Sequence, residues 1–245
     1  MAAVTAVTLL GLAKGGFSGM GALSLPLMAM TVSPIRAAAI LLPILIVQDV
    51  VGVWAFRRTW DRRVLAWMLP GAVAGIGLGY LYAASVSPGA VLGLVGAVSI
   101  LFGGYRLWGD RRGIPHASRS PGWVGSLFGV ASGFTSQVAH AGGPPFQLWV
   151  LPLRLERDVL VGTTAIFFAV VNWVKVPAYV ALGQFTPANL IAAAMLLPVA
   201  IGSTLAGVWL VRRVSAERFY TAIYVLMIVV GVKLTTDAFR GLLSL

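Results

Sequence analysis

Four ionisable side chains stand in the middle of apolar sequence in this chain, and they are its first candidates for chemistry: Lys14, Asp49, His140 and Lys175. A charge in such a setting is rare, and it usually binds a ligand, moves a proton or pairs with another charge. Two lysines against one aspartate leave a positive balance. That balance favours an anionic ligand over a cation.

The residues after Lys14 are typical of a break in a helix that binds an anion. Gly15 and Gly16 follow directly, and Ser18 adds a hydroxyl group. Glycines let the backbone unwind, and the N–H groups at a new helix start attract negative charge. We therefore predict that these four residues contact the ligand. The alternative is that Lys14 reaches an interface and the glycines only pack helices.

A second candidate group combines neutral hydrogen-bond donors, one histidine and a glycine-proline break. Its members are Thr135, Ser136, Gln137, His140, Gly142 and Gly143. The prolines that follow are favoured at the first position of a helix, so one helix should end here and another begin. Histidine exchanges protons near neutral pH, so His140 is a candidate for proton coupling. The alternative is a neutral histidine that makes structural hydrogen bonds.

The remaining charges lie in two long apolar segments. Asp49 follows Gln48, and Lys175 comes one helical turn after Asn172 on a similar face. Either Asp49 and Lys175 form a buried ion pair, or Lys175 binds the anion while Asp49 carries a proton. Four aromatic residues would line a cavity for an organic group: Phe146, Trp149, Phe168 and Trp173.

The composition predicts a helical membrane protein. Of the 245 residues, 59% are hydrophobic and 10% are charged, whereas a soluble domain carries about 25% charged residues. Apolar segments long enough to cross about 30 Å of hydrocarbon recur along the chain. The clearest are Ala37–Phe56, Val64–Ala84, Val91–Leu107, Val159–Leu182, Ala188–Val211 and Phe219–Leu234.

Similar features recur at an offset of about 125 residues, which indicates an internal duplication. Leu69-Pro70 with Gly79 is matched by Leu197-Pro198 with Gly207, and Gln48-Asp49 falls opposite Asn172-Trp173. We predict a first membrane repeat over residues 1–112, a cytoplasmic linker over 113–120 and a second membrane repeat over 121–245.

The arginines predict how the segments are oriented, because cytoplasmic connections carry an excess of Lys and Arg. Clusters at 57–63, 106–119 and 212–218 should all be cytoplasmic. Residues 121–153 must then cross the membrane an even number of times, yet they are too few for two comfortable spans.

We therefore predict a re-entrant hairpin over 121–153 and, by the same count, another over 2–32. The predicted fold is an all-α integral membrane protein with two inverted repeats. Each repeat is a broken hairpin plus three transmembrane helices, as in secondary transporters. The alternative is eight plain transmembrane helices, which places one arginine cluster on the wrong side.

Other classes of protein find little support. The chain has no cysteine, and no nucleophile or nucleotide-binding motif indicates an enzyme. The net charge of +11 comes from arginines between apolar segments, so we expect no nucleic acid as a partner. We expect a small anionic solute and membrane lipid as partners and no cofactor or metal. The sequence leaves a homodimer open.

Several short motifs, taken in order, resemble the TauE/SafE family of sulfite exporter-type membrane transporters. They are the stretch from Gly11 to Gly21, Ser33-Pro34 with Ala37-Ala38, Gln48-Asp49, Ser132 to Ser136 with His140 to Pro145, and Asn172 to Pro177. The resemblance extends over essentially the whole chain. It implies secondary transport of sulfite or an organosulfonate, with the two breaks as the substrate region.

Together these observations predict a multi-pass protein of the cell inner (plasma) membrane. An anion would be held between the two broken hairpins, and one bundle would move against the other to alternate access. The direction of transport and the coupling ion stay open. An anion channel on the same hairpins and a membrane assembly factor without a solute are the competing hypotheses.

Overall fold

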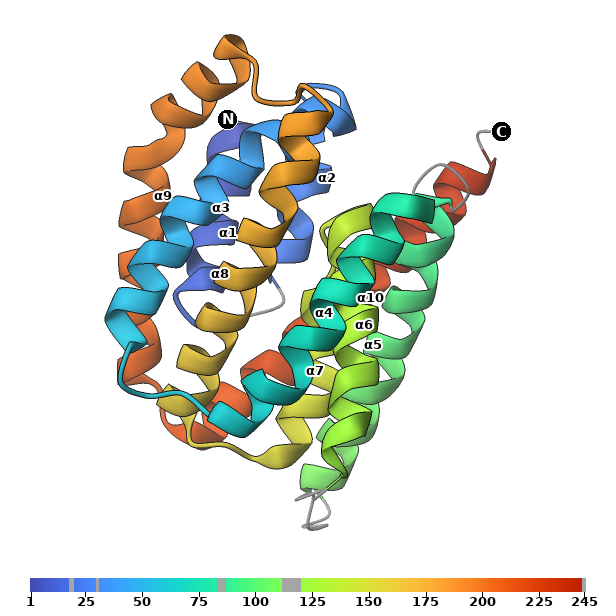
Figure 1. Ribbon diagram of the computed structural model, residues 1–245. Coiled ribbons are helices and arrows are strands. Elements are labelled where there is room, and N and C mark those ends of the chain that lie inside the picture. Colours follow the sequence, from blue (N-terminus) through green and yellow to red (C-terminus); the bar gives the residue numbers. More distant parts are fainter. Residues whose placement is uncertain (18–19, 30, 83–86, 112–119, 244–245) are drawn as a thin grey trace. The chain divides into compact units, whose positions relative to one another are not determined.

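The computed structural model describes residues 1–17, 20–29, 31–82, 87–111 and 120–243, and every regular element in those ranges is a helix (Figure 1). Six helices are long and apolar enough to cross a membrane: Ile35–Phe56, Arg62–Tyr82, Gly89–Gly109, Arg157–Ala181, Pro187–Arg213 and Glu217–Arg240. They overlap the six apolar segments that the sequence predicts. The described part of the chain is therefore all-helical, with the long apolar helices of a multi-pass membrane protein.

The helices group into two compact units, and each unit takes segments from both ends of the chain. Unit 1 contains residues 1–61 and 158–214, and unit 2 contains residues 62–157 and 215–245. Both predicted repeats, 1–112 and 121–245, thus contribute to both units. The repeats stay a prediction, and most of the linker between them lies outside the described residues.

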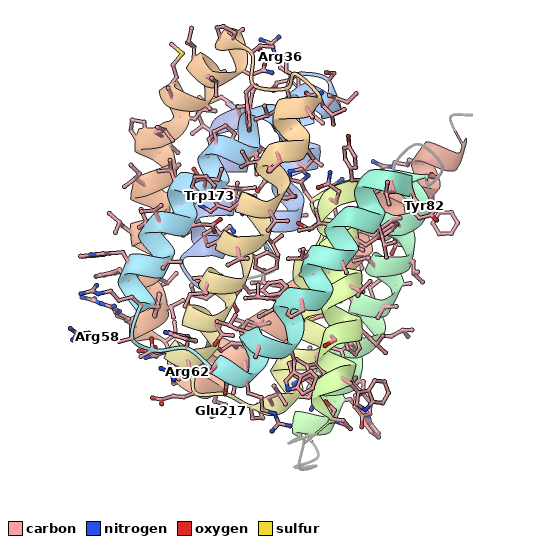
Figure 2. The ribbon with its side chains drawn as sticks, viewed as in Figure 1. Arg36, Arg58, Arg62, Tyr82, Trp173 and Glu217 are labelled. Atoms are coloured by element: carbon pink, nitrogen blue, oxygen red, sulfur yellow. The ribbon has the colours of Figure 1, made fainter. Side chains whose placement is uncertain are left out.

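Unit 1 contains α1 (Ala2–Lys14), the 3-10 turn η1 (Met20–Leu23), α2 (Ser24–Ala29), α3 (Pro34–Phe56), α8 (Arg157–Ala181) and α9 (Pro187–Arg213). Helices α3 and α9 run parallel. Near their first residues, Arg36 Nε donates to Asn189 Oδ1 over 3.1 Å. Near their last residues, Arg212 Nη2 donates to the Ala55 carbonyl oxygen, also over 3.1 Å. Figure 2 shows Arg36 and Arg58 at opposite ends of this unit.

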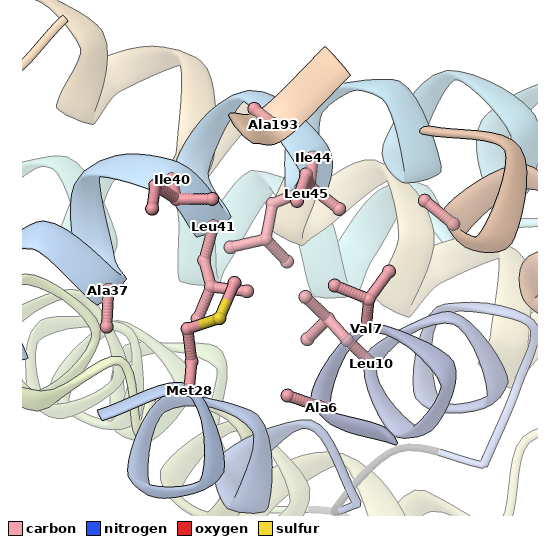
Figure 3. Packing of buried hydrophobic residues seen from close by; sticks show 11 residues of the cluster. Ala6, Val7, Leu10, Met28, Ala37, Ile40, Leu41, Ile44, Leu45 and Ala193 are labelled. Atoms are coloured by element: carbon pink, nitrogen blue, oxygen red, sulfur yellow. The ribbon is translucent and has the colours of Figure 1, made fainter. Parts of the chain in front are cut away.

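The apolar core of unit 1 is built by α1, α2, α3 and α9. Figure 3 shows its close packing, in which Leu10 of α1, Met28 of α2 and Leu41 of α3 converge. Helix α1 also lies directly on α9, because Gly11 packs against the Ser203 side chain and Gly15 faces Gly207 backbone to backbone. This contact fixes where α1 ends relative to its neighbours.

Unit 2 contains α4 (Arg62–Tyr82), α5 (Pro88–Arg111), α6 (Gly122–Ala139), α7 (Gly143–Val150), the 3-10 turn η2 (Leu151–Leu153) and α10 (Ala216–Leu243). Helices α6 and α7 form a hairpin. At its base, Trp149 Nε1 donates to Ser120 Oγ over 2.7 Å. At its tip, Ser132 Oγ donates to the Gly142 carbonyl oxygen, also over 2.7 Å. The chain thus enters and leaves this hairpin at the same end.

Two further contacts between helices of unit 2 are made through glycines, α4 with α6 and α5 with α10. On α4, a Cβ atom at Gly71 or Gly75 would clash with the backbone of α6, and Gly129 and Gly133 of α6 face α4 in return. Helices α5 and α10 pack along each other in the same manner, with the Gly96 and Gly231 backbones in contact. Small residues at such crossings let helices approach closely inside a membrane.

Candidate functional site

The strongest candidate site of unit 1 is a buried ion pair that joins α1 to α3. Lys14 Nζ lies 2.6 Å from Asp49 Oδ1, and the second carboxylate oxygen of Asp49 accepts a hydrogen bond of 2.7 Å from Asn172 Nδ2 on α8. The side chain of Lys14 is 13% exposed and that of Asp49 is 2% exposed. Three helices therefore contribute to one buried polar contact.

The position of Lys14 follows from the end of α1. The helix stops at this residue, where Gly15 and Gly16 close the last turn onto the Gly11 and Ala13 carbonyl oxygens. Gly16 has a φ of 140°, a conformation that side chains with a Cβ rarely adopt. A lysine in the last turn also places its positive charge at the negative end of the helix dipole.

Lys175 extends the site along α8. It is 1% exposed, and the charges of Lys14 and Asp49 both act on its ammonium group. One helical turn separates it from Asn172. One turn on the other side of Asn172, Phe168 places its ring 5.2 Å from Lys14 Nζ, so the ammonium of Lys14 faces an aromatic ring as well as a carboxylate.

Gln48 stands next to Asp49 and is fully buried. Its Nε2 donates a long hydrogen bond of 3.4 Å to the Val7 carbonyl oxygen, while its Oε1 has no hydrogen-bond partner among the described residues. A buried acceptor without a donor is unfavourable by about 1–3 kcal/mol. Gln48 therefore offers an acceptor to a donor that the described protein groups do not supply.

The second predicted group lies in unit 2, at the tip of the α6–α7 hairpin. Thr135 Oγ1 donates to the Ala141 carbonyl oxygen over 3.1 Å. His140 ends α6 in a left-handed conformation with a φ of 52°. Ser136 is buried, and Gln137 Oε1 is buried without a hydrogen-bond partner among the described residues. Gly142 and Gly143 begin α7.

The predicted site residues thus fall into two sets. Unit 1 holds Lys14, Gly15, Gly16, Gln48, Asp49, Asn172 and Lys175, and unit 2 holds Thr135, Ser136, Gln137, His140, Gly142 and Gly143. Ser18 lies outside the described residues. Within the described part of the chain, no group of acidic and histidine side chains is arranged to hold a metal ion.

Two features of these sites do not follow from the sequence patterns. The partner of Lys14 is Asp49, whereas spacing along the chain only placed Asp49 and Lys175 as candidates to pair. Ser132 holds the Gly142 carbonyl oxygen at the tip of the unit 2 hairpin; the sequence placed Ser132 in a family-like motif but did not predict this contact.

In chemical terms, unit 1 carries a polar cluster with more cationic than anionic groups. It combines two ammonium groups, one carboxylate, one amide donor and one aromatic ring, all in apolar surroundings. Such a cluster can hold a small anion by charge and hydrogen bonds.

Comparison with known protein families agrees with this description. A model of the family described as "Sulfite exporter TauE/SafE" matches residues 3–234. No curated protein and no solved structure matches the chain. Because the family match extends over nearly all of its helices, including both sets of candidate residues, the chain belongs to the TauE/SafE sulfite exporter family of membrane transporters.

Proposed function

We propose that this protein is a secondary transporter that moves a small sulfur-containing anion, sulfite or an organosulfonate, across the cell inner membrane by alternating access. The observation that carries the proposal is the buried cluster of Lys14, Asp49, Asn172 and Lys175 in unit 1. Charged groups inside a membrane segment are costly, so they persist where they serve transport or pairing.

The pattern of helix contacts supports the inverted-repeat architecture within this proposal. If residues 121–245 repeat residues 1–112, α1 corresponds to α6 and α9 corresponds to α4. The contact of α1 with α9 in unit 1 then has its counterpart in the contact of α6 with α4 in unit 2. Helices α5 and α10, which would correspond to each other, also pack together. A duplicated and exchanged arrangement accounts for all three contacts.

The direction of transport decides whether coupling is needed. Moving one negative charge inward against an inside-negative potential costs about 2.3 kcal/mol per 100 mV. Import therefore requires a coupling cation such as a proton, for which Asp49 and His140 are the candidates. Export of the same anion runs downhill without coupling.

Flux into proteoliposomes tests the proposal. Purified protein should carry sulfite or an alkylsulfonate with saturable kinetics, and Lys175→Met should lower the flux at least about tenfold because it removes a buried charge from the site. Lys233→Met is the matched control, since this lysine of α10 also pairs with an aspartate, Asp237, but both side chains are partly exposed. Non-saturating ohmic currents would identify a channel instead. Absence of flux and of binding for every sulfur anion would overturn the proposal.

A further inference from the structure

The acidic residues of unit 1 are few, and their positions define the charge of the buried cluster. They are Asp49, Asp61 and Asp158. Asp158 stands in the first turn of α8, 17 residues before Lys175, which corresponds to about 25 Å along a helix. It is too far away to neutralise Lys175.

Asp61 is also remote from Lys175. Its backbone N–H donates to Thr163 Oγ1 over 2.9 Å. This contact places Asp61 beside the first turns of α8, about 18 Å along the helix from Lys175. Asp49 is the carboxylate of unit 1 that pairs with Lys14, and its charge also acts on Lys175.

The basic side chains of unit 1 other than these two lysines are arginines at the helix ends. Arg36 stands at the start of α3, and Arg57 and Arg58 follow its last turn. Arg154 is not among these residues, because it belongs to unit 2. Arg212 and Arg213 stand in the last turn of α9. Counting both lysines as ammonium groups and Asp49 as a carboxylate, the cluster has a formal charge of +1.

Lys14 retains capacity for a second negatively charged partner. An ammonium group has three N–H donors, and among the described residues Lys14 Nζ gives one hydrogen bond, to Asp49. Its side chain is the partly exposed member of the cluster, whereas Asp49 and Lys175 are shielded. An incoming anion would therefore meet an ammonium group before it meets the carboxylate.

We propose that this cluster selects its ligand by charge: Asp49 acts as a built-in counter-ion that leaves room for one further negative charge, so the site takes singly charged sulfur oxyanions. This inference rests on the proposed function and specifies its substrate class. A monoanion neutralises the two lysines together with Asp49. A dianion leaves one uncompensated negative charge in apolar surroundings, which is unfavourable.

The experiment compares methanesulfonate with sulfate, which have nearly the same shape but carry one and two charges. Binding to the purified full chain in detergent is measured by ligand-induced stabilisation across a concentration series. The wild-type protein should bind methanesulfonate at least about tenfold more tightly than sulfate. Asp49→Asn raises the cluster to +2, so its preference should shift toward sulfate by at least about tenfold.

Two further variants keep the test decisive. Asp49→Glu retains the carboxylate and should retain the wild-type preference. Lys175→Met brings the cluster to zero, and it should weaken methanesulfonate binding at least about tenfold even if Asp49→Asn does not fold. Equal binding of both anions by the wild-type protein, or an unchanged preference in Asp49→Asn, would overturn the charge rule while leaving anion transport intact. If the wild-type protein neither binds nor transports any sulfur anion, the proposed function falls with it.

Discussion

At the scale of single residues, the pair of Lys14 and Asp49 differs from a surface ion pair because both partners lie within apolar surroundings. Removing one partner of a buried pair leaves the other charge uncompensated, which typically costs about 3–5 kcal/mol. Lys14→Met should therefore lower the free energy of unfolding by about that amount, as measured by denaturation in mixed micelles.

The pair of Lys233 and Asp237 on α10 provides the matched comparison, because it has the same chemistry but 43% and 25% exposed side chains. Lys233→Met should cost less than about 1 kcal/mol. The double variant Lys14→Met with Asp49→Asn should recover more than half of the loss, since no unpaired charge is then buried. Equal losses for the two lysine variants would contradict a buried ion pair.

His140 poses a different question, because its backbone conformation and its side chain both constrain the residue type. Its φ of 52° lies in the left-handed region, which asparagine and glycine tolerate but β-branched residues do not. His140→Val should lower the free energy of unfolding by about 1–2 kcal/mol relative to His140→Asn. Thermal unfolding of the two variants measures the difference, and similar stabilities would show that the tip of the hairpin is not held in this conformation.

The sequence predicted candidate site residues that unit 1 brings together, but it did not predict which of them touch. Lys14, Asp49, Asn172 and Lys175 are recognisable because each polar group interrupts an apolar segment. The partner of Asp49 depends on how α1, α3 and α8 are rotated about their axes, and neither hydropathy nor spacing encodes rotation between helices far apart in the chain. The contact of Lys14 with Asp49 therefore required the structure.

At the scale of elements, the lengths of the helices were predictable and their packing was not. Apolar length defines a span, a pair of glycines marks the end of α1, and a glycine-proline run marks the end of α6. The sequence indicated the packing of α1 against α9 and of α4 against α6 less clearly than it indicated the helix lengths. The indication is the spacing of four residues between the glycines at 11 and 15 and at 71, 75 and 79, which is typical of a face that another helix approaches closely.

The packing of α4 against α6 leads to a prediction with its control in the same helix. A Cβ atom at Gly75 would clash with the Val130 carbonyl oxygen, whereas a Cβ atom at Gly77 meets no atom within 4 Å. Gly75→Ala should lower the free energy of unfolding by about 1–3 kcal/mol because backbone cannot easily give way. Gly77→Ala should be neutral or stabilising by up to about 1 kcal/mol. Thermal unfolding in detergent measures both, and equal effects would argue against this helix contact.

At the scale of the whole molecule, the order of the elements along the chain differs from their grouping in space. The sequence reads as two successive halves, yet each compact unit combines segments from both. Similar sequence in the two halves indicates duplication. The compact units show instead which helices bury surface against each other. The proposed exchange of helices between duplicated halves would satisfy both, and the predicted repeats alone do not give the two units.

The parallel course of α3 and α9 in unit 1 bears directly on membrane topology. Arg36 contacts Asn189 at one end of the two helices, and Arg212 contacts the Ala55 carbonyl oxygen at the other. Arg58 and Arg213 therefore belong to one end of unit 1, and Gln184, which precedes α9, belongs to the opposite end. Eight plain spans would instead require Arg58 and Arg213 to emerge on opposite sides of the membrane.

Single cysteine substitutions can test this arrangement directly, because the chain has no native cysteine that must first be removed. We expect Arg58→Cys and Arg213→Cys to react with a membrane-impermeant thiol reagent from the cytoplasmic side, in line with the excess of arginine there. Gln184→Cys should react from the other side. Each cysteine variant is labelled in intact cells and in inverted vesicles, and the reacted protein is detected by its increase in mass.

In an eight-span protein, positions 58 and 184 would share a side and position 213 would lie across the membrane from them. That pattern would remove the re-entrant hairpins, because only an even number of crossings between residues 121 and 153 keeps positions 58 and 213 together.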